Sequence, residues 1–196
     1  MIRRFFSPPI FEGNEEKTRT AELLNTVLIA LTVLGTLALL SIFLGQTASA
    51  AIYVIVVIFI ILTVLMQIPM RLGYIKPVGF LAVLFFTVTV SLALMNGGSI
   101  RAPAVTFYIL TIIMSGLIIG RRAAYWSATI NTIIFLAILW LEINGRLPEP
   151  NFTVNIQQGI IFTLGSIFAA ILLGIALRRL NESLEQARLG EENYRF

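Results

Sequence analysis

Apolar residues gather in six long stretches, separated by short segments that carry most of the charges. The stretches cover residues 23–44, 51–67, 78–95, 105–119, 123–141 and 154–177. A helix of about 20 residues crosses a hydrocarbon core of about 30 Å, and most of these stretches approach that length. Backbone groups in lipid must be satisfied within a segment, and no stretch alternates polar and apolar residues as a barrel strand would. The sequence therefore predicts an all-α, polytopic membrane protein with six transmembrane helices.

Basic residues fall in alternate connections between these stretches. If the amino terminus is cytoplasmic, 12 of the 14 lie on the inner side, and only Arg101 and Arg146 face outward. Short loops rich in Lys and Arg stay in the cytoplasm. Residues 1–20 have no apolar region before Pro8 and Pro9, so they are interpreted as a cytoplasmic tail rather than a signal peptide. We expect a multi-pass protein of the inner (plasma) membrane with both termini cytoplasmic.

The composition limits the chemistry. The chain is 58% hydrophobic and 12% charged, and it contains no Cys, His or Asp. Disulfides, thiolate chemistry, Cys/His metal sites and His-ligated haem are therefore excluded. No charged side chain falls in the middle of a predicted span, which argues against a proton-coupled pump. The net charge of +4 reflects membrane topology, so no nucleic acid is expected as a partner. The sequence predicts no catalytic residue, cofactor or metal.

Four polar residues are candidates for binding a ligand. Asn131 lies near the middle of the fifth span, where its amide could bond to a neighbouring helix or contact a ligand; interhelical bonding is favoured. Gln157 and Gln158 open the sixth span and could line the mouth of a cavity, although solvation at the interface explains them equally well. Arg101, in the outer loop 96–104, could hold an anionic lipid or ligand group, or be a solvated turn residue.

Small residues at a spacing of four indicate where helices approach closely. The clearest pair is Gly116 and Gly120, at the inner end of the fourth span. The sixth span offers two further pairs, which are Gly165 with Ala169 and Ala170 with Gly174. Each pair is a candidate packing face.

The last apolar stretch continues into a charged segment with helical spacing. Apolar positions recur at intervals of four and three residues, at Leu173, Leu177, Leu180, Leu184 and Ala187. This heptad pattern predicts a helix that leaves the membrane at Arg178 and Arg179 and pairs with a second copy of the chain as a coiled coil. The alternative is a solvated amphipathic tail.

This ending resembles a known linker. "LRRLNESLEQARLGEENYRF" is similar to the segment that joins the last membrane helix of bacterial sensor proteins to a PAS domain. Residues 96–131 resemble the multi-pass input regions of sensor histidine kinases, with a Gly-rich outer loop, an Ala-Pro helix start and a Gly-Arg-Arg-Ala inner turn. The sequence differs in having no PAS core, phospho-accepting His or ATP-binding domain. The resemblance implies the membrane input portion of such a kinase, either cut from a longer product or encoded alone.

We therefore expect three regions: a tail at 1–20, a six-helix domain at 21–177, and a signalling helix at 178–196 that leads toward an output domain. The expected function is sensing and dimerisation, with membrane lipid, a second copy and a membrane protein as partners. The chain itself is not expected to be an enzyme, whereas a full-length parent would be a protein histidine kinase. The alternatives are a structural subunit of a larger membrane complex, or a small transporter or channel.

Overall fold

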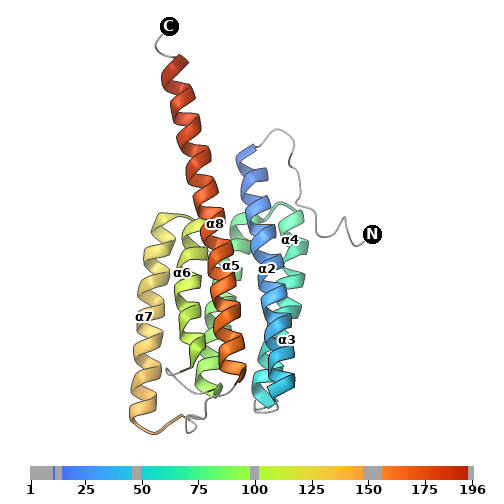
Figure 1. The fold of residues 1–196 in the computed structure, drawn as a ribbon, viewed down its shortest axis with the longest axis vertical. Helices are drawn as coiled ribbons and strands as arrows, with labels where there is room; N and C mark the ends of the chain where they lie inside the picture. Colours follow the sequence, from blue (N-terminus) through green and yellow to red (C-terminus); the bar gives the residue numbers. More distant parts are fainter. Residues whose placement is uncertain (1–10, 12–14, 46–49, 98–101, 148–155, 194–196) are drawn as a thin grey trace.

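The computed structural model describes residues 11, 15–45, 50–97, 102–147 and 156–193, with the backbone alone for some helix ends and for 179–193. Every regular element in these residues is helical, and Figure 1 shows them as a bundle of roughly parallel rods. The elements are α2 (Glu15–Gly45), α3 (Ala50–Leu65), α4 (Gln67–Arg71), α5 (Ile75–Gly97), η2 (Pro103–Thr106), α6 (Phe107–Ile118), α7 (Arg121–Ile143) and α8 (Ile156–Asn193). The predicted all-α class with six helical segments is confirmed. In the described part of the chain, five helices are long and apolar enough to cross a membrane.

The fourth predicted span is the shortest in the structure. It consists of a 3₁₀ turn, η2, followed by the 12 residues of α6. Pro103 opens η2. At this first position a backbone N–H would have no partner within the helix, so its absence in proline costs no hydrogen bond. At 2.0 Å and 1.5 Å per residue, the two elements together extend about 26 Å. This short rod lies inside the bundle and packs against α2, α5, α7 and α8.

The second span contains a break that the hydrophobic pattern does not reveal. The expected span ends at Gln67, whereas the helical rod runs over Ala50–Arg71 and is interrupted at Met66. Pro69 lacks the N–H that would bond to the carbonyl of Leu65, and this loss separates α3 from α4. The run of apolar residues therefore predicted an end at Gln67, four residues before the observed end at Arg71.

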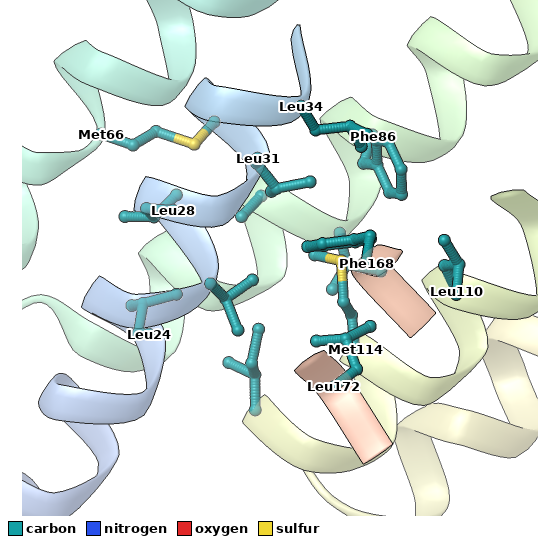
Figure 2. Packing of buried hydrophobic residues seen from close by; sticks show 14 of the residues in the cluster. Leu24, Leu28, Leu31, Leu34, Met66, Phe86, Leu110, Met114, Phe168 and Leu172 are labelled. Carbon is teal, nitrogen blue, oxygen red and sulfur yellow. The ribbon is translucent and has the colours of Figure 1, made fainter. Parts of the chain in front are cut away.

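One apolar core joins the helices. Figure 2 shows Leu24, Leu28 and Leu31 of α2 facing side chains of the other rods. At its centre, the Phe86 ring of α5 lies 5.8 Å from the Phe59 ring, 6.0 Å from that of Phe107 and 6.1 Å from that of Phe168. Aromatic pairs at such separations add to the area that they bury. Phe86 thus connects α3, α6 and α8 at one level of the bundle.

The two ends of the bundle differ in charge. The beginning of α2, the α4–α5 turn, the α6–α7 turn and the projecting part of α8 share one end (Figure 1). Basic residues mark each of these segments, and those described are Lys17, Arg19, Arg71, Lys76, Arg121, Arg122 and Arg178. Arg146 follows α7 at the opposite end. The alternation found in the sequence thus separates charge in space; which end faces the cytoplasm stays a prediction.

The last helix runs without interruption past the double arginine. α8 has 38 residues and therefore extends about 57 Å, well beyond a hydrocarbon core of about 30 Å. Its carboxyl-terminal part projects from the bundle (Figure 1). At the other end of the chain, helix α2 already begins at Glu15, within the expected tail of residues 1–20. Pairing of α8 with a second copy stays a prediction.

Candidate functional site

A cluster of polar side chains lies between α5, α6 and α7. Ser91 of α5 has its Oγ 2.9 Å from the hydroxyl oxygen of Tyr108 on α6. The single Ser91 hydrogen is donated to the carbonyl of Thr87 at 2.7 Å. The Tyr108 hydroxyl is therefore the donor and Ser91 Oγ the acceptor. This bond ties α5 to α6 within the apolar part of the bundle.

Asn131 connects α7 to the same region of α6. It is 4% exposed, and its Nδ2 donates to the Tyr108 carbonyl at 3.2 Å and to Thr111 Oγ1 at 2.5 Å. Thr111 in turn donates its hydroxyl to the Tyr108 carbonyl at 2.8 Å. Both hydrogens of the Asn131 amide are thus committed to α6. These are interhelical bonds of the kind favoured for this residue from the sequence.

Two atoms of the cluster have no hydrogen-bond partner. They are the Oδ1 of Asn131 and the Oγ of Ser127, both fully enclosed. Ser127 is 8% exposed and lies four residues before Asn131, so the two side chains occupy the same face of α7. In hydrocarbon, a polar atom without a partner costs several kcal/mol. The α7 face toward α6 therefore presents one open acceptor and one open hydroxyl.

The glycine pair predicted at the α6–α7 junction serves two different purposes. A Cβ at Gly116 would lie 3.3 Å from the Cβ of Ala124, so this glycine allows α6 and α7 to approach closely. Gly120 lies outside both helices, with φ of 125° and ψ of 176°, and it forms the turn between them. The two glycines therefore do not form one packing face of a single helix.

The two small-residue pairs of α8 have opposite environments. A Cβ at Gly165 would lie 2.9 Å from Phe107 Cε1, and Ala169 packs against the core. A Cβ at Gly174 would meet no other side chain or helix within 4 Å, and Ala170 is exposed. Only the Gly165 face is used within the described bundle.

The other predicted site residues lie in the 96–104 loop and along α8. Arg101 lies outside the described residues, and Gln157 and Gln158 are in the first turn of α8, with side chains that are not described. Leu173 and Leu177 are 57% and 52% exposed on α8. The other seam residues, Leu180, Leu184 and Ala187, are helical, and their side chains are not described.

Sequence reasoning did not identify the partners of Asn131. Tyr108, Thr111 and Ser115 recur at intervals of three and four residues and are all buried. That spacing puts them on one helix face, so a polar stripe on the short fourth span was a signal present in the sequence. Among the described residues, no three acidic side chains gather to hold a metal ion. The cluster is suited to hydrogen bonding with a neutral group rather than to metal chemistry.

The fold defines a multi-pass helical membrane protein. No protein-family model matches the chain, and neither a curated protein nor a solved structure matches it. The resemblance to the input regions of histidine kinases thus has no support from family comparison.

Proposed function

We propose that the chain is a membrane-embedded sensory and dimerisation domain that passes a signal through α8 to a cytoplasmic output module, as in two-component signalling. The observation that supports this proposal is the continuity of α8, from its packed part in the bundle past Arg178 to Asn193. A continuous helix moves as a unit, so a shift, rotation or piston movement inside the membrane reaches its far end. The catalytic step belongs to the output module in this proposal.

The packing around α8 provides a route for such a movement. Gly165, Phe168 and Leu172 of α8 are buried in the bundle, and Phe107 lies directly against Gly165. Phe107 begins α6, the helix to which Asn131 of α7 is hydrogen-bonded. In this proposal, a displacement of α7 passes through α6 to α8 by these contiguous contacts. These contacts establish proximity between the three helices.

A second copy of the chain is the partner that this proposal requires. Leu173 and Leu177 are exposed at the end of the packed part of α8. The same heptad spacing continues through Leu180 and Leu184 along the projecting part. In a coiled coil, such positions face the partner helix. We propose that two copies pair along this seam, with lipid or a membrane protein around the remaining faces.

Cysteine crosslinking tests the pairing directly, because the natural chain contains no cysteine. Under mild oxidation in native membranes, Leu180→Cys and Leu184→Cys should each form disulfide-linked dimers. Glu182→Cys is the matched control, because position 182 lies off the seam. The proposal expects at least about tenfold less dimer there. Equal crosslinking at all three positions, or none at the leucines, would contradict a shared seam.

Phase insertion tests transmission. The chain is joined after Phe196 to the cytoplasmic part of a histidine kinase, and residues are inserted after Leu180. Seven inserted residues restore the heptad register, whereas four rotate everything beyond the insertion relative to the membrane domain. We expect autophosphorylation close to the uninserted level with seven residues and a change of at least about threefold with four. A kinase activity that is indifferent to register would contradict signalling through α8, even if crosslinking showed a dimer.

A further inference from the structure

The hydroxyl of Ser127, like that of Ser41, is buried and makes no hydrogen bond, which sets it apart from many other hydroxyls in the described helices. In the described helices, Ser and Thr side chains repeatedly donate to the carbonyl four residues earlier, as at Thr26, Thr32, Thr36, Thr63, Ser91, Thr129, Thr132, Thr163 and Ser166. This bond satisfies a hydroxyl without any partner from another helix. Ser127 is buried and makes no hydrogen bond, although α7 begins early enough to offer it the carbonyl of Ala123. Its Oγ thus has no partner on a buried face.

The Asn131 amide is oriented with its nitrogen toward α6. Nδ2 faces the carbonyl of Tyr108 and the Oγ1 of Thr111, whose own hydrogen is already donated to that carbonyl. A flipped amide would place Oδ1 against the Tyr108 carbonyl, which only accepts, and would require the Thr111 hydroxyl to give up its own bond to that carbonyl. The oxygen therefore stays on the side without a partner, one helical turn from Ser127.

The two open atoms define the chemistry that they accept. Asn131 Oδ1 only accepts hydrogen bonds, whereas a serine hydroxyl both donates and accepts. One hydroxyl group can donate to Oδ1 and accept from the Ser127 hydroxyl. Nothing in the cluster carries a charge, and an ion in hydrocarbon without a counter-charge is strongly disfavoured. A neutral hydroxyl satisfies both atoms at once.

We propose that Ser127 and Asn131 form a binding site for one hydroxyl group between α6 and α7. The hydroxyl is carried either by water or by an alcohol or phenol dissolved in the membrane. The site goes beyond the signalling role proposed above and does not depend on it. If α8 signals as proposed, occupancy of this site acts on the α7–α6 contact from which the route to α8 begins.

Both open atoms are fully enclosed in the packed bundle, so a ligand reaches them only when α7 separates from α6. α7 lies at one edge of the bundle and packs against α6 and α5 (Figure 1). Of its buried side chains, Ser127 and Asn131 are polar and only Ile138 is apolar, so separating α7 from α6 exposes little apolar core. Its outward face carries exposed Ile130 and Ile133. An amphiphile with a narrow chain can therefore enter along the seam between α6 and α7.

Tryptophan fluorescence is a specific reporter for this helix. The chain contains two tryptophans, Trp126 and Trp140, and both are on α7. The full chain in phosphatidylcholine nanodiscs is titrated with 1-decanol, and in parallel with decyl methyl ether, which accepts a hydrogen bond but cannot donate one. Variants Ser127→Ala and Asn131→Leu remove the two open atoms. Thr132→Val is the matched control, because Thr132 is exposed and its hydroxyl bonds to the carbonyl of Ala128 in its own helix.

An alcohol site predicts a saturable fluorescence change with decanol in the wild type and in Thr132→Val. The ether should give only the unsaturable response of the bilayer, and either site variant should weaken decanol binding at least about fivefold. A water site predicts no saturable response to decanol. Instead, NMR should detect a long-lived contact between water and the ¹⁵N-labelled side-chain amide of Asn131, and Ser127→Ala should abolish this contact. Circular dichroism checks the helix content of each variant, and Ser127→Ala, which deletes one atom, should retain it.

Two results would overturn the proposal. The first is the absence of both the saturable decanol response and the long-lived water contact in the wild type. The second is a decanol response that the ether reproduces, or that persists unchanged in Ser127→Ala. Either result would mean that the open atoms of Ser127 and Asn131 do not hold a hydroxyl.

Discussion

Replacing Gly79 by alanine is expected to lower the free energy of unfolding by about 1–3 kcal/mol, as overpacking of a filled core does. A Cβ at this position of α5 would collide with the Cγ2 of Ile118 on α6. That methyl group is attached directly to the branched Cβ of isoleucine, so it cannot move away without a change of χ1 or of the backbone. α5 and α6 would have to separate where α5 begins and α6 ends.

The matched control for this substitution is Gly174→Ala on α8. A Cβ there has nothing within 4 Å, and alanine is about 1 kcal/mol better than glycine inside a helix. Unfolding by SDS from a mild detergent, followed by circular dichroism, should show Gly79→Ala shifted to lower SDS and Gly174→Ala unchanged or shifted to higher SDS. The interpretation of the α5–α6 approach fails if both alanine variants behave alike.

Substitution of Gly120 by asparagine is expected to lower the free energy of unfolding by about 1–3 kcal/mol. Its φ of 125° and ψ of 176° fall in a region that is open to glycine and closed to residues with a side chain. The turn between α6 and α7 is short, so relief of this strain must tilt α7. The tilt would also disturb the hydrogen bonds from Asn131 to α6.

Gly145→Asn is the control for the turn at Gly120. Gly145 has φ of 65°, and the bonds from its N–H to Glu142 and from Arg146 to Leu141 complete the left-handed cap that ends α7. Asparagine enters this conformation readily. SDS unfolding is followed by the fluorescence of the two α7 tryptophans. The midpoint should fall clearly for Gly120→Asn, whereas Gly145→Asn should lower the free energy of unfolding by at most about 0.5 kcal/mol. A Cβ at Gly120 has nothing within 4 Å, so an equal loss in both variants would contradict the role given to its backbone conformation.

The helices were predictable because lipid imposes the same requirement on every span. A stretch must be long, apolar and internally hydrogen-bonded, and each of these properties can be counted along the chain. The exceptions have local causes. Pro69 breaks the second span at Met66, and the fourth begins at Pro103 with a 3₁₀ turn. Proline marks where an interruption is permitted, but the extent of the distortion depends on the neighbouring helices.

The candidate site was predictable only in part. An amide in the middle of a span is conspicuous in any sequence, so Asn131 was identified as a candidate. Its partners were not, because Tyr108 and Thr111 lie 23 and 20 residues away in the chain and meet it only when α6 packs on α7. The same limit applies to Ser127, since every serine in a membrane helix looks as if it could bond to its own backbone.

Sequence by itself determined the class of the protein, the approximate spans, the alternation of basic connections and the exclusion of Cys and His chemistry, because these depend on composition and on distance along one helix. The tertiary structure alone decided which glycines contact another helix, which leucines of α8 stay exposed and which polar atoms remain unpaired. Each of these properties depends on a neighbour from another helix. Such contacts depend on how the helices pack, and the helices are too similar in apolar composition for their sequences to reveal which faces meet.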